Sequence, residues 1–124
     1  MKKIILLLVL ALFGIWACNA EDARKKESDY VKEWCGRHGG RVEVRLDDGT
    51  RADCVTNTHA IEFDFAPKYA EGFGQAVHYA RVSGLRAGIV LICEKAGDEV
   101  KLGWLMNDID SVGADVTVWN MGCE

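Results

Sequence analysis

The stretch RVEVRLDDGTRADCVTNTHAIEFDFA, residues 41–66, contains three segments in which apolar and polar residues alternate. Alternation with a period of two is typical of β-strands. Asp48 and Gly49 stand at the centre of the first break between the segments, as in a hairpin turn. A second tight turn follows at Asn57 and Thr58. The stretch therefore predicts a three-stranded antiparallel meander over residues 41–46, 51–56 and 59–66.

The two faces of this meander differ in chemistry. Ile61 and Phe63 of the third strand share one face, and Glu62 and Asp64 share the other. Asp53 of the second strand can lie opposite these two carboxylates. Carboxylates are costly inside a sheet unless a cation or hydrogen bonds satisfy them. The acidic face is therefore either a solvated surface or a metal-binding site. In the first case it is balanced by the arginines of the first two strands, Arg41, Arg45 and Arg51.

The segments on either side of the meander predict alternating helices and strands. A helix is expected over residues 29–34, with Ser28 or Asp29 as its N-cap. After the meander we expect a helix that Gly84 ends, a buried strand, a third helix and a last strand, over residues 68–83, 87–93, 98–112 and 115–120. This order, α-β-β-β-α-β-α-β, predicts a single α/β domain over residues 29–124, with a mixed sheet flanked by helices.

The second helix carries three polar-tipped residues on one ridge. With about 100° of rotation per residue, Lys68, Gln75 and Tyr79 project within roughly 40° of one another. They stand about a third of a turn from the apolar stripe, which comprises Tyr69, Phe73, Ala76, Val77 and Ala80. Because this helix directly follows the acidic strand, the ridge can add an amine, an amide and a phenol to the carboxylates.

This combination of groups suits phosphodiester hydrolysis. Mg²⁺ prefers oxygen ligands, usually one or two carboxylates together with waters and substrate phosphate. A nearby lysine can stabilise the charge that develops during the reaction. Asp53 and Glu62 are the expected metal ligands and Lys68 is the expected amine. Gln75 and Tyr79 are expected to position the site or to contact the substrate.

The segment from Asp48 to Ala80, followed by GIVLI, resembles the PD-(D/E)xK nuclease superfamily. That superfamily includes restriction endonucleases, archaeal Holliday-junction resolvases and RecB-type nuclease domains. The resemblance covers about residues 29–94. It implies a restriction-endonuclease-like αβββαβ core, here extended by a further αβ unit. It also implies Mg²⁺ or Mn²⁺ as the cofactor and DNA or RNA as the partner.

The motif residues of that family map onto individual positions of this chain. Asp53 matches the metal-binding aspartate of the second core strand, and Glu62 matches the first acidic position of the (D/E)xK element. Gln75 and Tyr79 resemble the QxxxY helix motif of RecB-type members. The extra acidic residue that some members carry would be Glu33 on the first helix, with Glu43 as the alternative.

The sequence departs from the family at the lysine. The lysine of (D/E)xK is expected at position 64, where this chain has Asp64. In some members the lysine has moved to the following helix, and Lys68 would be that residue. Without a functional Lys68, Asp64 would be a third metal ligand together with Asp53 and Glu62. In that case the domain is expected to be a catalytically inactive envelope lipoprotein that uses the same fold for binding or structure.

Residues 1–17 have the features of a signal peptide. A basic start at Lys2 and Lys3 precedes an apolar run that is shorter than the roughly 20 residues of a membrane-spanning helix. The run ends in IWAC, which resembles a bacterial lipobox and implies lipidation of Cys18 and a membrane anchor. Simple cleavage after Ala20 is the alternative. Residues 18–28 are highly charged and predict a tether. We expect an exported envelope protein that faces the periplasm or the cell surface, or that is soluble in the periplasm or secreted.

Four cysteines follow Cys18, and an even number in a small exported domain favours two disulfides. Their spacing contains no CxxC pair, which argues against zinc. Three pairings are possible. We expect Cys35–Cys54 and Cys93–Cys123, because the second pair would join the ends of the last two strands.

The formal net charge of −4 argues against a broad nucleic-acid-binding surface. It leaves room for a small site in which a metal offsets phosphate charge. The tryptophans Trp34, Trp104 and Trp119 are expected to anchor the core. The histidines His38, His59 and His78 are expected at the surface, since no two of them have the spacing of metal ligands.

Overall fold

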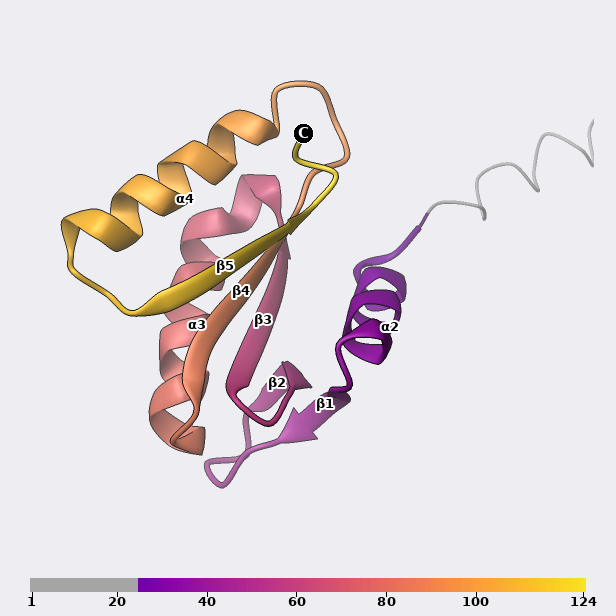
Figure 1. Cartoon of the computed structure of the whole chain (residues 1–124), viewed down its shortest axis with the longest axis vertical. Coiled ribbons are helices and arrows are strands. Elements are labelled where there is room, and N and C mark those ends of the chain that lie inside the picture. The colour runs from indigo at the N-terminus through magenta and orange to yellow at the C-terminus, as the bar shows by residue number, and fades with distance from the viewer. Residues whose placement is uncertain (1–24) are drawn as a thin grey trace, which may run out of the picture.

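The computed structural model describes residues 25–124 and has an α/β fold with three helices and one five-stranded sheet (Figure 1). The predicted order of elements is confirmed. The helices and strands are α2 (Glu27–Arg37), β1 (Arg41–Arg45), β2 (Arg51–Val55), β3 (His59–Phe65), the 3₁₀ turn η2 (Ala66–Lys68), α3 (Tyr69–Ser83), β4 (Arg86–Ile92), α4 (Glu99–Ser111) and β5 (Val116–Met121). The predicted signal peptide, lipidation at Cys18 and most of the tether lie outside the described residues.

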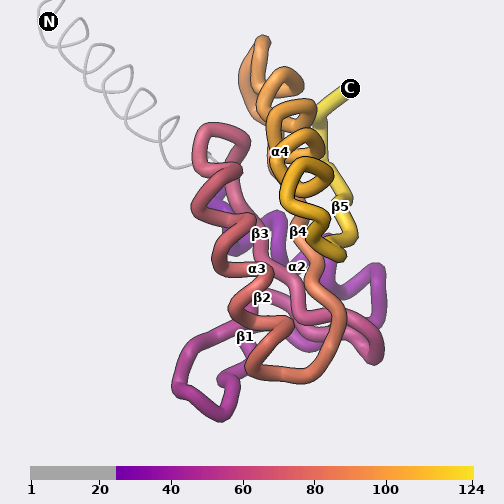
Figure 2. The backbone as a smooth tube through the Cα atoms, turned by 90° about the vertical axis from the view of Figure 1, so that its left-hand side faces the viewer, coloured from indigo at the N-terminus to yellow at the C-terminus, as the bar shows by residue number. Residues whose placement is uncertain are grey.

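The strands lie in the sheet in the order in which they occur in the chain, β1-β2-β3-β4-β5. The pairs β1–β2 and β2–β3 are antiparallel, and the pairs β3–β4 and β4–β5 are parallel. Helices α3 and α4 connect the parallel strands and pack together on one face, whereas α2 covers part of the other face (Figures 1 and 2). This is the predicted mixed sheet flanked by helices.

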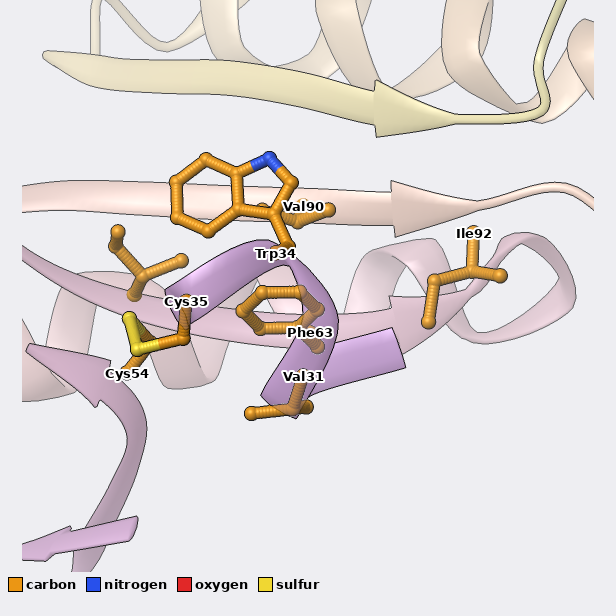
Figure 3. Close-up of a cluster of buried hydrophobic side chains, with 8 residues drawn as sticks. Val31, Trp34, Cys35, Cys54, Phe63, Val90 and Ile92 are labelled. Carbon is orange, nitrogen blue, oxygen red and sulfur yellow. A yellow bond between two sulfur atoms is a disulfide. The ribbon is translucent and has the colours of Figure 1, made fainter. Parts of the chain in front are cut away.

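The core is centred on β4, whose residues from Ala87 to Ile92 are all buried. This confirms the prediction of a strand covered on both faces. On the α2 side, Val31 and Trp34 pack against Phe63, Val90 and Ile92 (Figure 3). On the other side, side chains of α3 and α4 pack against Ile89 and Leu91. The site described below lies beside this core, at the edge where the antiparallel hairpin joins it.

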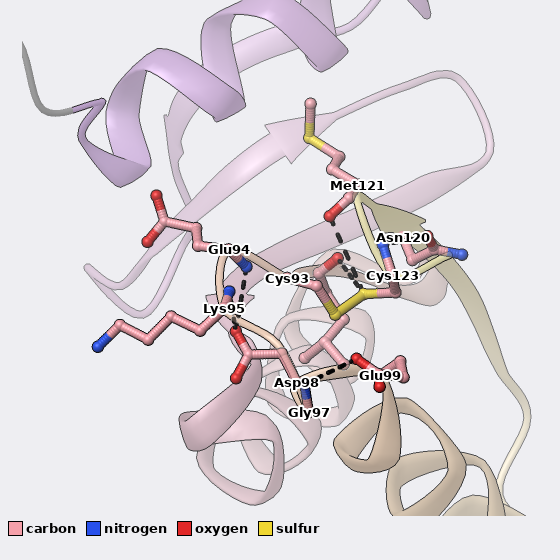
Figure 4. The surroundings of a disulfide bond; sticks show 10 residues. Cys93, Glu94, Lys95, Gly97, Asp98, Glu99, Asn120, Met121 and Cys123 are labelled. Atoms are coloured by element: carbon pink, nitrogen blue, oxygen red, sulfur yellow. Dashed lines mark hydrogen bonds between the residues drawn. A yellow bond between two sulfur atoms is a disulfide. The ribbon is translucent and has the colours of Figure 1, made fainter.

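Two disulfides link the segments, with the predicted pairing. Cys35 of α2 is bonded to Cys54 of β2, and Cys93 is bonded to Cys123 just beyond the ends of β4 and β5 (Figure 4). Disulfides are typical of proteins outside the reducing cytoplasm, so they indicate an extracytoplasmic domain. Within residues 25–124, no helix has the length and apolar character needed to cross a membrane.

The first helix is longer than predicted and has a different N-cap. It begins at Glu27 and continues to Arg37, and Lys26 occupies the N-cap position expected for Ser28 or Asp29. Asp29 stands at the third position of the helix, where its Oδ2 accepts the backbone N–H of Lys26 at 2.9 Å. The carboxylate therefore closes the first turn from inside the helix.

The first strand does not keep its apolar residues on one face. Glu43 has a backbone φ of 48°, so the strand turns over at its centre. Val44 therefore packs near Tyr79 with Leu46, whereas Val42 is 44% exposed. Strict alternation in the sequence predicted a single apolar face, and the left-handed residue overrides it.

Several side chains that were predicted to be buried are exposed, or the reverse. The buried stripe of α3 consists of Gly72, Ala76 and Tyr79, and Val77 is exposed. Helix α4 turns Trp104 and Met106 outward, with 46% and 49% of each exposed. The core-anchor prediction therefore fails for Trp104, although Trp34 is buried and Trp119 is half-buried. The histidine prediction fails for His59, which is 8% exposed.

Candidate functional site

The candidate site forms where β2 separates from β3. The two strands pair only through Cys54 with Ile61 and Val55 with Ala60, although β3 continues to Phe65. Beyond this point the Oδ2 atom of Asp53 accepts the backbone N–H of Phe63 at 2.7 Å. The carboxylate thus replaces the neighbouring strand as the hydrogen-bond partner, and it is held beside Glu62.

The carboxylates of Glu62 and Asp64 lie beneath α3, and each residue is only 6% exposed. Gly72 lets the helix come close, because a Cβ at that position would lie 2.8 Å from Oδ2 of Asp64. Tyr79 belongs to the same buried stripe. Burial raises the pKa of Tyr79 to about 12, and the charges of Glu62 and Asp53 contribute. The phenol therefore stays protonated at neutral pH.

The interpretation of the acidic strand as a solvated face is wrong. A wet face would leave Glu62 and Asp64 open to water, but α3 covers both. Nor do the arginines of the first two strands balance them: Arg41, Arg45 and Arg51 are exposed. Of the ion pairs within residues 25–124, none joins an arginine to Asp53, Glu62 or Asp64.

Glu62 is the electrostatic centre of the site. Burial raises the pKa of Glu62 to about 10, and the charge of Asp53 and a hydrogen bond to its side chain add to the shift. Burial also raises the pKa of Asp53, opposed by the hydrogen bonds from Phe63 and Glu62. Glu62 is therefore protonated at neutral pH, beside the carboxyl group of Asp53. In the described part of the chain, Glu62 Oε2 is the only buried side-chain nitrogen or oxygen atom without a hydrogen-bond partner.

More acidic groups surround this pair, and one lysine opposes them. Burial raises the pKa of Asp64 to about 7, and the charges of Glu27 and Glu71 raise it further, while Lys68 lowers it. Burial and the charge of Asp53 raise the pKa of Glu27, which Lys68 again lowers. Lys68 therefore acts electrostatically on the site from its exposed position at the start of α3.

The structure separates the two candidates for an extra acidic residue. Glu33 lies on the outer surface of α2 and pairs with Lys25 at 2.6 Å and Arg37 at 3.6 Å. Glu43 instead lines a pocket of about 210 Å³ together with Asp53 and Glu27. Of the two predicted acids, only Glu43 lies beside the site.

Glu27 is the site residue that the sequence analysis missed. It lies in the first turn of α2, two residues before the predicted start of that helix. An acidic residue in a first helical turn is common because it favours the helix dipole. Its sequence position therefore does not distinguish a site residue from a capping residue. Gln75 lies half-exposed on α3, between the positions of Gly72 and Tyr79.

The chemistry of the donors fits a hard divalent cation. Mg²⁺ usually takes one or two carboxylates from a protein, and Asp53 and Glu62 form such a pair with one oxygen that lacks a partner. Among residues 25–124, however, no group of three or more His, Cys, Asp or Glu side chains is placed to hold a metal ion. The structure thus brings Asp53 and Glu62 together without closing a three-carboxylate site around Asp64.

No protein-family model, curated protein or solved structure matches this chain. The resemblance to PD-(D/E)xK nucleases therefore rests on the motif residues and the order of the elements. The interpretation of the site depends on the geometry and charge of its own side chains.

Proposed function

We propose that this chain is an exported, metal-dependent phosphodiesterase of the PD-(D/E)xK type that cleaves DNA or RNA outside the cytoplasm. The observation that carries the proposal is the Glu62 carboxyl, which is buried beside Asp53 and has one oxygen without a partner. Leaving a buried polar atom unpaired costs about 1–3 kcal/mol. A cation bound where β2 separates from β3 would give the unpaired oxygen a partner and so remove this cost.

In this proposal each residue of the site has a distinct role. Asp53 and Glu62 would hold Mg²⁺ or Mn²⁺, which when bound offsets phosphate charge and lowers the pKa of a bound water. Asp53 is oriented for this by its hydrogen bond from Phe63. Tyr79 keeps its proton and can donate a hydrogen bond. Lys68, whose charge already acts on Asp64 and Glu27, would stabilise the charge that builds up on the phosphate.

Attachment to the bacterial envelope belongs to the same proposal. The lipobox resemblance supports lipidation of Cys18, with cleavage after Ala20 as the alternative. The two disulfides support an oxidising compartment for the folded domain. The residues between the anchor and Glu27 would then act as a tether.

A second candidate function is a catalytically inactive envelope lipoprotein that uses the fold for binding or structure. Two observations favour it: Asp64 stands where the family has lysine, and Lys68 is exposed. Within the described residues, Lys68 forms no ion pair with any carboxylate. In this case the buried carboxyl pair would be a remnant of the catalytic site.

A cleavage assay separates the two functions. The oxidatively folded protein is incubated with plasmid DNA, single-stranded DNA and RNA, with Mg²⁺, Mn²⁺ or a chelator. We expect cleavage that requires metal and is lost in Asp53→Asn and Lys68→Ala. Lys101→Ala is the matched control, because Lys101 lies on α4 over the ring of Trp104, and this variant should retain full activity.

The outcomes are distinct. Absence of cleavage on all three substrates would favour the inactive lipoprotein. Cleavage that survives Asp53→Asn would place the chemistry elsewhere. Glu27→Gln should reduce activity while Glu33→Gln leaves it unchanged, since only the first of these two α2 acids lines the pocket with Asp53.

A further inference from the structure

A second depression lies on the α2 side of the sheet, away from the buried carboxylates. It is a groove of about 350 Å³ between the C-terminal end of α2, the turn between β2 and β3, and β5. Its aromatic lining residues are Trp34, His38, His59 and Trp119. This volume is at the lower end of the range of about 300 to 1,000 Å³ for small-molecule sites, so the groove suits one ring system.

The aromatic side chains of this groove are already arranged for stacking. The ring of His38 lies parallel to that of Trp34, with centroids 3.7 Å apart and planes 13° from parallel. Trp119 lies 5.1 Å from Trp34, and His59 meets the ring of Trp119 edge-on at 5.2 Å. Trp34 is buried, so the rings that a ligand can reach are those of exposed His38 and half-buried Trp119.

The central strand β4 has a glycine, Gly88, where the ring of Trp119 packs against it. A Cβ at Gly88 would lie 2.8 Å from Cζ3 of Trp119 and 3.0 Å from Cγ1 of Ile61. Glycine weakens the interior of a strand, and it often marks a close approach of another group. The indole therefore packs directly against the backbone of β4 at Gly88.

The groove has no charged partner for a charged ligand. Within the described part of the chain, none of the nine lining residues is Asp, Glu, Lys or Arg. Both ring nitrogens of His59 are occupied, with Oγ1 of Thr58 at 2.7 Å and Oγ1 of Thr117 at 2.9 Å. Burial lowers the pKa of His59, which keeps the ring neutral at pH 7. The exposed polar side chains at the groove are His38, Asn57 and Thr58.

We propose that this groove binds one nucleobase of a nucleic-acid strand, stacked on the ring of His38 and bordered by the tilted ring of Trp119, with its edge towards Asn57. A base is a flat, uncharged ring, and stacking on aromatic side chains tolerates any base sequence. The phosphates would stay outside, where the groove offers them no cation. This inference rests on the proposed nuclease function. It extends that function with a subsite for a substrate base.

The two depressions lie along the same helix. Val31 lines the pocket with Asp53, whereas Trp34 lines the groove. These two residues differ by about 4.5 Å in rise along α2. A strand whose base is held at the groove can therefore continue along α2 towards Asp53.

Nucleosides test this subsite without phosphate and without metal. Trp104→Phe removes the exposed indole on α4 and serves as the background for tryptophan fluorescence. In this background, adenosine or cytidine should quench the emission saturably. His38→Ala should weaken binding by about 5- to 150-fold, because base–aromatic stacking contributes about 1–3 kcal/mol. Asn57→Ala should weaken it less. Asp53→Asn should leave it unchanged.

Three results would overturn the inference. The first is the absence of saturable quenching by any nucleoside up to about 10 mM, which would mean that the dissociation constant lies above the millimolar range. The second is equal affinity in the parent and in His38→Ala. The third is binding of methyl glucoside but not of nucleosides, which would identify a sugar site.

Failure of the subsite is distinguishable from failure of the nuclease function. If the protein cleaves nucleic acid but binds no nucleoside, only the base subsite is refuted. If nucleosides bind as predicted and no substrate is cleaved with any metal, the subsite stands and the nuclease function is refuted.

Discussion

Replacing Glu62 with glutamine should remove most of the dependence of folding stability on pH between pH 7 and 9. In the folded protein the pKa of Glu62 is raised to about 10, mainly by burial, and in the unfolded chain it returns to its ordinary value of 4.5. Across this range the folded state holds a proton that the unfolded state has lost. Stability must therefore fall as pH rises.

The expected magnitude is large. One extra proton in the folded state corresponds to a slope of about 1.4 kcal/mol per pH unit, so roughly 3 kcal/mol is lost between pH 7 and 9. Stabilities of small domains are about 5–15 kcal/mol, so this loss is easily measured. Neither His59 nor Tyr79 titrates in the folded protein between pH 7 and 9. Burial lowers the pKa of His59 below 6.5, and the pKa of Tyr79 is raised from 10 to about 12. Asp64, with its pKa at about 7, contributes mainly below this range.

Urea unfolding at pH 7, 8 and 9, with a chelator present and both disulfides intact, measures this slope. Glu62→Gln keeps the shape of the side chain and cannot ionise, so its free energy of unfolding should be nearly flat across the range. It should exceed that of the parent at pH 9. Glu33→Gln is the matched control, because Glu33 is exposed on the outer surface of α2, and it should keep the parental slope. Parallel slopes for the parent and Glu62→Gln would refute the buried, protonated carboxyl.

Three further predictions concern stability. Gly72→Ala should destabilise the fold by about 1–3 kcal/mol, because its Cβ would overlap the buried carboxylate of Asp64. Gly74→Ala, in open space on the same helix, should stabilise the fold by up to about 1 kcal/mol. Equal effects of the two substitutions in thermal melts would contradict this packing. Mg²⁺ should raise the melting temperature, more at pH 9 than at pH 7, because binding displaces a proton; a shift that persists in Asp53→Asn would exclude this site. Changing Cys93 and Cys123 together to serine should lower the free energy of unfolding by about 3–4 kcal/mol in urea titrations, and no loss would show that the bond is not needed for stability.

The order of the elements could be predicted because local patterns set it. Alternation in residues 41–66 marks the three antiparallel strands, and the apolar run before Cys93 marks the buried strand. The disulfide pairing followed from the predicted ends of the last two strands. These predictions rest on local sequence patterns, which can be recognised without knowing the three-dimensional structure.

The depth of individual side chains could not be predicted in the same way, because it depends on which neighbour covers them. Tyr79 is buried with Gly72 and Ala76 on the face of α3 that covers the carboxylates, because Gly72 removes the steric barrier to close approach, whereas Lys68 is exposed and Gln75 half-exposed. Spacing alone does not reveal this. His59 is buried because two threonines, one of them on β5, satisfy its ring. The site residue Glu27 was missed because a local carboxylate cap and an active-site acid look alike in sequence.

The pairing of each cysteine with the next one in the described chain bears on how the protein reaches its native state. Cys35 bonds to Cys54 before Cys93 follows in the chain, and Cys123 then finds Cys93 as its remaining partner. The strand order also follows the chain, so each strand adds to a sheet edge that already exists. A chain that emerges N-terminus first and oxidises as it emerges can therefore form native bonds in sequence. Its maturation should need an oxidant and no disulfide isomerase.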